Sequence, residues 1–204
     1  ALCKIAHRQD AMAEVVSGLE YQLAEKTGFS GEDILFNGPV KEEKELYKAF
    51  HDGAIVQFDS YEEIRILKRY LKEYPDKTVS CALRCNFNIG EKERSRFGFD
   101  VESGEATTVY NELFSLKGCR PAGIHCHFST RHRSLDSFKL RTEKLGGFAR
   151  SIFEGQIRNL DYVNIGGGFF GEVNEQNKDQ FPAQTPSFAD YAEVIGHIMK
   201  KNFP

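Results

Sequence analysis

Short apolar runs alternate with longer amphipathic stretches along the whole chain, and this alternation constrains the fold more than any other feature. The runs are rich in β-branched and aromatic residues, which is typical of buried strands. The stretch Tyr61–Glu73 shows the helical pattern, since Ile64, Leu67 and Leu71 fall at i, i+3 and i+7. Strands that alternate with helices predict a parallel sheet with helices packed outside it.

Six strand–helix units can be placed on the chain. The expected strands are residues 14–17, 33–37, 54–58, 78–86, 122–128 and 162–165. The expected helices are residues 18–26, 42–51, 61–73, 105–116, 135–154 and 187–200, and residues 1–13 also look helical. A doubly wound sheet accommodates six units, and a closed barrel of the triosephosphate-isomerase type needs about eight. The pattern alone favours neither strongly.

Composition limits the classes of protein to consider. The 204 residues are 40% hydrophobic and 28% charged, which suits one globular domain over residues 1–204. The net charge of −3 gives no bulk attraction to nucleic acid or to an anionic membrane, and no apolar run resembles a membrane span or a signal peptide. The five cysteines follow no zinc or disulfide spacing, so we expect reduced thiols in a cytoplasmic protein. They are Cys3, Cys81, Cys85, Cys119 and Cys126.

A pair of histidines marks the end of the fifth expected strand. His125 and His127 are two residues apart, so along a strand they point the same way. At the C-terminal end of a barrel strand, that direction can lead into the active-site mouth. Such a histidine could stack on a flat ring, ligate a metal or shuttle protons. Two hydrogen-bonded core histidines are the alternative.

Three consecutive glycines follow the sixth expected strand, at Gly166, Gly167 and Gly168. Their backbone N–H groups are not shielded by a Cβ atom, and such loops bind phosphate groups. A tight turn is the alternative. The spacing matches neither a Walker loop nor a Rossmann fingerprint.

Arg84 closes the longest expected strand. An arginine that points into a barrel needs a partner, because an unpaired buried charge is costly. A bound anion or phenolate is one candidate partner, and a neighbouring carboxylate is the other.

These motifs carry a resemblance when they are taken in order with other segments of the chain. The segments are residues 14–20 (EVVSGLE), 34–41 (ILFNGPVK), 58–63 (FDSYEE), 83–84 (LR), 95–98 (SRFG), 123–127 (GIHCH) and 164–169 (NIGGGF). Together they resemble the fold-type III pyridoxal-phosphate-dependent decarboxylases. This group includes diaminopimelate, ornithine and arginine decarboxylases, with alanine racemase more remote. The resemblance covers nearly all of the chain.

The resemblance implies an α/β fold, namely a (β/α)8 barrel of the alanine racemase/ornithine decarboxylase kind. We expect the central part of this barrel, with its first and last strands missing from the chain and the C-terminal β domain absent. Pyridoxal 5'-phosphate is the implied cofactor. His127 matches the histidine that stacks on its ring, Arg84 an arginine near the ring, and Glu14 an acidic residue behind it. The residues matched to the phosphate site are Gly166, Gly167, Gly168 and Thr130.

The chain departs from the family pattern at several positions. Ser129 stands where the family usually has glycine, and Phe170 replaces a common proline. The Schiff-base lysine of the family would lie upstream of Ala1, and Lys4 matches a helical position instead. The family's Glu-Pro-Gly motif would follow Pro204. We therefore expect residues 1–204 alone to be inactive, and insoluble or oligomeric, since an open barrel exposes two strand edges.

The resemblance implies a cytoplasmic homodimer that decarboxylates a basic or diamino acid, such as diaminopimelate or ornithine, through a Schiff base. Lysine or polyamine biosynthesis would be its context. An amino-acid racemase, or a non-catalytic homologue that binds the cofactor or a partner, are the alternatives. A metal-dependent hydrolase built on His125 and His127 ranks last, because no further ligands stand at other strand ends. The segment 169–186 carries acidic residues that could meet a distal amine of the substrate, or could simply be solvated.

Overall fold

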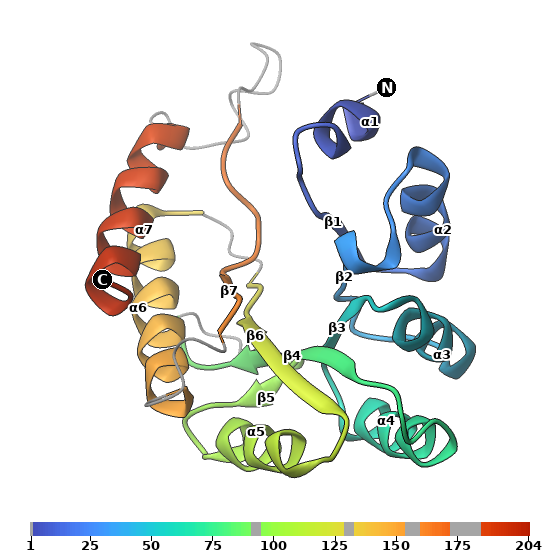
Figure 1. The fold of residues 1–204 in the computed structure, drawn as a ribbon. Coiled ribbons are helices and arrows are strands. Elements are labelled where there is room, and N and C mark those ends of the chain that lie inside the picture. The colour runs from blue at the N-terminus through green and yellow to red at the C-terminus, as the bar shows by residue number, and fades with distance from the viewer. Residues whose placement is uncertain (1, 91–94, 129–132, 154–159, 172–184) are drawn as a thin grey trace.

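A computed structural model of the chain shows one parallel sheet curled into an open arc, with helices along its outer face (Figure 1). The structure describes residues 2–90, 95–128, 133–153, 160–171 and 185–204. The alternation of strands and helices along the sequence therefore gives the predicted arrangement, and the curvature is that of part of a barrel.

The elements follow the chain in strict alternation apart from one short additional strand. The strands are β1 (Ala13–Val15), β2 (Ile34–Phe36), β3 (Ile55–Phe58), β4 (Val79–Asn86), β5 (Phe99–Asp100), β6 (Cys119–His125) and β7 (Tyr162–Asn164). The helices are α1 (Leu2–His7), α2 (Gly18–Thr27), α3 (Glu43–Asp52), α4 (Tyr61–Glu73), α5 (Glu105–Ser115), α6 (Leu135–Ile152) and α7 (Phe188–Asn202), with a 3-10 turn, η1 (Gly31–Asp33), before β2.

The strand order is β1-β2-β3-β4-β6-β7, and β5 pairs with the end of β4. All the pairings are parallel. Between successive strands in the order β1-β2-β3-β4-β6-β7, the chain carries at least one helix to the outer face, as in parallel crossover units. The register aligns Leu35 with Ile55, Gln57 with Ala82, Ala82 with Gly123, and His125 with Asn164.

Alternate residues of each strand face two different cores. The larger core lies between the sheet and the helices and includes Phe36, Val56, Leu83 and Ile124. Burying one such side chain contributes about 1.5–3 kcal/mol. The smaller core lies inside the arc and contains Leu35, Ile55 and Ala82, with Tyr162 packed against them.

Tyr162 explains a glycine in the neighbouring strand. A Cβ atom at Gly123 would lie 2.7 Å from Cε1 of the Tyr162 ring. Only glycine leaves room for this ring, which therefore reaches over β6 to the inner core. The inner surface is filled by side chains, as in the barrels of this class.

Serine begins four of the helices. The Oγ atoms of Ser17, Ser60, Ser134 and Ser187 accept hydrogen bonds from backbone N–H groups in the first turns of α2, α4, α6 and α7. Each such cap is worth about 1 kcal/mol. Each of these serines sets the residue at which a strand-to-helix loop ends. These loops form the rim of the arc at the C-terminal ends of the strands.

Several predicted boundaries were wrong. The first helix ends at His7 and is followed by a turn in which Asp10 has φ +57°, so residues 1–13 are not one helix. β6 ends at His125 rather than residue 128, and β5 was not predicted. A two-residue strand is too short to show a sequence period. The predicted end of the sixth helix, residue 154, lies outside the described residues.

Both edges of the arc are open in the described part of the chain. β1 pairs only with β2, and β7 only with β6. Beside β1, Leu2 and Leu19 on α1 and α2 are 80% and 68% exposed. Beside β7, an apolar groove of about 440 Å³ runs along the strand and α7. Its lining includes Val163, Ile165, Ile195, Met199 and Phe203. The chain thus presents apolar surface at both ends of its sheet.

None of the helices in the described ranges is long and apolar enough to cross a membrane. All five cysteines are free thiols. The sulfur atoms of Cys81 and Cys119 lie 3.4 Å apart on neighbouring strands, and those of Cys85 and Cys126 are buried in the outer core.

Candidate cofactor site

A layer of polar side chains lies inside the arc, near the C-terminal ends of the strands. Four of these side chains stand two positions after Leu35, Ile55, Ala82 and Tyr162 of the inner apolar layer, so both layers share one face. Barrels of this type bind their ligands at this end. The layer consists of Glu14, Asn37, Gln57, Arg84, His125 and Asn164.

Glu14 joins the two edges of the arc. Its Oε1 accepts hydrogen bonds from the amide of Asn37 and from Nδ2 of Asn164, the latter at 3.0 Å. The Oδ1 atom of Asn164 accepts in turn from the N–H of Gly166 at 2.8 Å. The acidic residue is therefore held by two amides and linked through Asn164 to the glycine loop. Glu14 comes from β1 and Asn164 from β7, which face each other across the opening in Figure 1.

The histidine and glycine motifs meet at the ends of β6 and β7. The N–H of Gly167 donates a hydrogen bond to Nδ1 of His127 at 3.3 Å. Gly166 has φ +72°, and a Cβ atom there would lie 2.5 Å from the carbonyl oxygen of Cys126. Gly168 has φ +93°. A Cβ atom at Gly167 or Gly168 would meet nothing within 4 Å, so this backbone borders open space.

His127 is uncharged at neutral pH. Desolvation lowers its pKa, and the positive charges of Arg84 and Arg141 lower it further. An acceptor Nδ1 requires a neutral ring, so the hydrogen bond from Gly167 agrees with this direction. His127 lies beyond the end of β6 and is exposed. Thr130, the other residue matched to the phosphate site, lies outside the described residues.

His125 is in a different environment from His127. It is 1% exposed, and neither ring nitrogen has a hydrogen-bond partner among the described residues. Desolvation, followed by the charge of Arg84, lowers the pKa of His125 to about 3. Because β6 ends at His125, strand alternation does not govern His127, and the two imidazoles are not an exposed pair at the mouth. In the described ranges, no group of three His, Cys, Asp or Glu side chains is placed to hold a metal ion.

Arg84 has a carboxylate partner. Its Nη1 lies 2.7 Å from Oδ2 of Asp59, so the second of the two partners considered for it is the one observed. The other oxygen of Asp59 accepts from the N–H of Gly98 at 2.9 Å, which ties the loop before β5 to the site. The Arg84 guanidinium also lies 5.0 Å from the ring centroid of Phe97. Asp59 thus fixes both Arg84 and the loop at residues 95–98.

A second buried ion pair supports Asp59 from behind. Glu63 accepts from the N–H of Asp59 at 2.7 Å and pairs with Nζ of Lys41 at 2.8 Å. Burial lowers the pKa of Lys41 and raises that of Glu63, and their mutual attraction opposes both shifts. Lys41 also donates to the carbonyl oxygen of Gln57 at 2.8 Å. The loop after β2 is thereby locked to α4 beneath the site.

Sequence reasoning missed five residues of this neighbourhood: Asn37, Gln57, Asp59, Arg141 and Asn164. Asn37, Gln57 and Asn164 carried a usable signal, since each is a polar residue at an inward position of an apolar run. Both polar atoms of the Gln57 side chain are buried without a hydrogen-bond partner in the described part of the chain. Asp59 and Arg141 depend on tertiary contacts that no local pattern shows.

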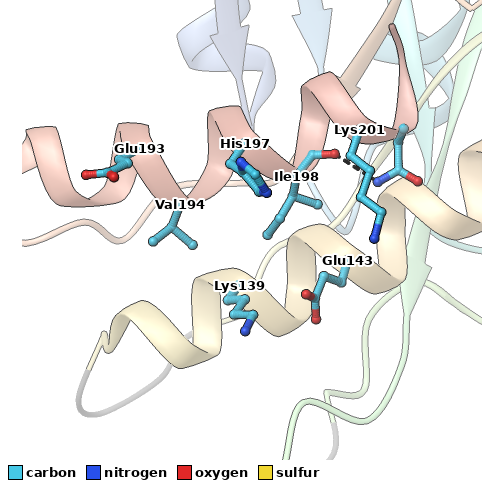
Figure 2. Close-up of a pocket in the computed structure, with 8 residues that line it drawn as sticks. Lys139, Glu143, Glu193, Val194, His197, Ile198 and Lys201 are labelled. Carbon is cyan, nitrogen blue, oxygen red and sulfur yellow. Dashed lines mark hydrogen bonds between the residues drawn. The ribbon is translucent and has the colours of Figure 1, made fainter.

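A groove of about 630 Å³ lies elsewhere, between α6 and α7 (Figure 2). It is lined only by residues of these two helices and receives nothing from the strand ends. Its charges are mixed, with Lys139 and Lys201 beside Glu143 and Glu193. The polar layer, rather than this groove, is the candidate site. The remaining lining residues are Val194, His197, Ile198 and Asn202.

A parallel barrel arc with a neutral histidine and an open glycine loop at adjacent strand ends defines a cofactor-binding barrel protein. The family model described as "Pyridoxal-dependent decarboxylase, pyridoxal binding domain" matches residues 1–204. The chain belongs to this family. The resemblance found in the sequence, and the barrel fold that it implied, are therefore confirmed.

Named relatives agree with this assignment. Diaminopimelate decarboxylase of Methanocaldococcus jannaschii is 27% identical over 98% of this chain and 46% of its own length. L-glutamyl-[BtrI acyl-carrier protein] decarboxylase of Niallia circulans is 30% identical over 82% of this chain and 41% of its own length. A crystal structure of the M. jannaschii enzyme superposes with a TM-score of 0.83 at 26% identity, covering 98% of this chain and 46% of that one. The chain thus spans about half the length of the relatives it matches.

The residues present fit pyridoxal phosphate, which is the cofactor of the family. The glycine loop borders open space and carries two residues with positive φ, which is the geometry of a backbone anion cradle. The exposed, neutral His127 offers a flat face beside it. The polar layer supplies an acidic residue and an arginine, both already fixed by partners.

Proposed function

We propose that the full-length protein is a pyridoxal-phosphate-dependent decarboxylase of a basic or diamino acid, such as diaminopimelate or ornithine. The hydrogen bond from Gly167 to Nδ1 of His127 is the observation that carries this proposal. It holds a flat ring next to a phosphate-binding type of loop, and pyridoxal phosphate has both a ring and a phosphate. When bound, the cofactor supplies an electron sink, and the protein supplies orientation.

Each predicted site residue has a proposed task. The imidazole of His127 would stack on the pyridine ring and fix its plane, and the lowered pKa of His127 favours a neutral ring against that face. Gly166, Gly167, Gly168 and Thr130 hold the phosphate. Arg84, fixed by Asp59, would hold the cofactor near its phenolic oxygen, and Glu14, fixed by two amides, would support it from behind. The bond to be broken is oriented by these contacts relative to the ring plane.

The wider setting is also proposed. Free thiols at all five cysteines support a reducing compartment such as the cytoplasm. Exposed apolar side chains on α1 and α2 support contact with further protein, as in a homodimer. The net charge of −3 gives no bulk attraction to nucleic acid or to an anionic membrane.

A decarboxylation assay on the full-length protein tests the proposal. The protein is saturated with pyridoxal phosphate and offered diaminopimelate, ornithine, arginine and lysine, with release of carbon dioxide and the chirality of the remaining amino acid both measured. We expect carbon dioxide from one diamino or basic acid. Loss of chirality without carbon dioxide would show a racemase instead. Cofactor binding without either reaction would show a non-catalytic homologue.

A further inference from the structure

Arg141 is a buried arginine that lacks an ionic partner. Arg141 is 1% exposed, and its Nε and Nη1 atoms have no hydrogen-bond partner in the described part of the chain. Nη2 donates to Oγ of Ser137 at 3.2 Å. A guanidinium stays charged in proteins, so this charge is buried with most of its donors unused. Such an arrangement is costly unless an anion joins it.

The surroundings of Arg141 lead to both cofactor motifs. Its guanidinium lies 4.0 Å from the ring centroid of Phe138 and 5.8 Å from that of Phe128. Phe128 directly follows His127. Phe138 stacks on Phe169 at 4.5 Å, and Phe169 directly follows Gly168. The arginine thus lies among the rings that flank the histidine and the glycine loop.

The positive charge of Arg141 affects a residue of the candidate cofactor site. It is one of the two positive charges that lower the pKa of His127. No aspartate or glutamate forms an ion pair with it among the described residues. The aromatic rings compensate the charge in part through cation–π contacts, but they cannot accept its unused N–H groups in the way an oxygen anion does.

We propose that Arg141 is an anion-binding residue of the cofactor site, and that its guanidinium binds the phosphate held by Gly166–Gly168. This inference rests on the proposed function. Phosphate oxygens accept strong, charge-assisted hydrogen bonds from a guanidinium, and the N–H groups on Nε and Nη1 of Arg141 have no partner among the described residues. Sequence reasoning placed Arg141 only within a predicted helix, so this role emerges from burial and contacts.

Binding of two ligands by the full-length apoprotein tests the proposal. Dissociation constants are measured for pyridoxal phosphate and for pyridoxal, which lacks the phosphate. Arg141→Met keeps the length of the side chain without its charge, and Arg150→Met, at an exposed position of the same helix, is the control. We expect Arg141→Met to raise the dissociation constant of pyridoxal phosphate by about tenfold or more. Its affinity for pyridoxal, and both affinities of Arg150→Met, should stay unchanged.

Thermal unfolding of the apoprotein with inorganic phosphate gives an independent result. Without phosphate, Arg141→Met should unfold at a higher temperature than the wild type, because a costly unpaired charge has been removed. Added phosphate should raise the unfolding temperature of the wild type and have a smaller effect on the variant. If Arg141→Met does not fold, Arg141→Gln is measured in the same way.

Two outcomes would overturn the role of Arg141. An equal loss of affinity for pyridoxal phosphate and for pyridoxal would show that the arginine only supports packing of the phenylalanine rings. Unchanged affinity for pyridoxal phosphate would show that it does not contact the phosphate. A wild-type protein that binds neither ligand would instead contradict the proposed function, so the two failures are distinguishable.

Discussion

The buried imidazole of His125 makes the stability of the folded state depend on pH. Its ring is enclosed at the end of β6 and its pKa is lowered to about 3, chiefly by desolvation. In the unfolded chain a histidine has a pKa of about 6.5. Below that value the unfolded state gains a proton that the folded state does not accept. The stability due to the neutral ring is therefore complete above pH 6.5 and is lost as the pH falls toward 3.

Replacing His125 with asparagine should remove this dependence. Between pH 7 and pH 5 the free energy of unfolding of the wild type should fall by about 2 kcal/mol more than that of His125→Asn. Urea unfolding of the full-length apoprotein at the two pH values measures the difference. The exposed His197, replaced in the same way, is the control. An equal fall in the wild type and His125→Asn would contradict the burial of a neutral ring.

The sequence predicted the site residues that belong to a contiguous motif. It missed those that come together only in the folded structure. His127 and the three glycines were found because each motif is contiguous and follows an apolar run. The partner of Arg84 stayed open between an anion and a carboxylate, since Asp59 is 25 residues away along the chain. Arg141 carried no signal, because a helix shows which residues share a face and not what that face meets.

Among the loops, the one after β7 depends on the conformation of one glycine. Alanine at Gly166 would have to adopt φ +72° and place its Cβ 2.5 Å from the carbonyl oxygen of Cys126. We expect Gly166→Ala to lower the free energy of unfolding by about 1–3 kcal/mol. Gly167→Ala finds open space and should leave stability unchanged, although it should weaken pyridoxal phosphate binding.

Chemical denaturation and cofactor titration of both variants check this prediction. The two glycines are neighbours in one loop, so they form a matched pair. Equal stability of Gly166→Ala and Gly167→Ala would show that the loop does not have the conformation described. Unchanged cofactor affinity in Gly167→Ala would show that the open face of the loop is not where the phosphate binds.

The connection between the β2–α3 loop and α4 depends on the buried pair of Lys41 and Glu63. Removing one member leaves an uncompensated charge, so Lys41→Met should lower the free energy of unfolding by about 3–5 kcal/mol. The double variant Lys41→Met/Glu63→Gln should recover much of this loss. The glutamine can still accept the hydrogen bond from Asp59.

Denaturant unfolding of the single and double variants measures the coupling. Arg65→Ala, which breaks the exposed ion pair with Glu62, is the control and should change stability by less than about 1 kcal/mol. A double variant as unstable as Lys41→Met would show that the lysine contributes packing rather than charge.

Most elements were predictable because the hydrophobic period marks them, and in four helices a serine cap agrees with that period. The serines that begin α2, α4, α6 and α7 stand where each amphipathic pattern starts. Strand ends were less predictable, since pairing with neighbours decides how far a strand runs. β6 stops at His125 although the apolar pattern continues to Phe128, and this difference separates the environments of the two histidines.

On the scale of the whole molecule, the open arc has a consequence for association. β1 and β7 each lack a second partner in the described part of the chain, and apolar surface lies beside both. Unpaired strand edges promote association between chains. We expect residues 1–204, produced alone, to be oligomeric or insoluble in sedimentation velocity. A stable monomer would contradict the exposure of these edges.

The fold class followed from the sequence once the motifs were ordered, because pattern alone left a doubly wound sheet and a barrel open. The curvature of the sheet decides between them, and it arises from packing inside the arc rather than from any single strand. Tyr162 over Gly123, and Glu14 bound to Asn164 across the opening, are contacts of that kind. They could not be predicted from local periodicity.

Borohydride reduction followed by intact mass measurement shows whether the full-length protein carries pyridoxal phosphate at the rim of this barrel, as we propose. Borohydride reduces the carbon–nitrogen double bond between a lysine and the cofactor. The resulting single bond keeps the cofactor attached to the chain during the mass measurement. We expect the mass to increase by one reduced pyridoxyl-phosphate group per chain. An unchanged mass, after incubation with excess pyridoxal phosphate, would contradict it.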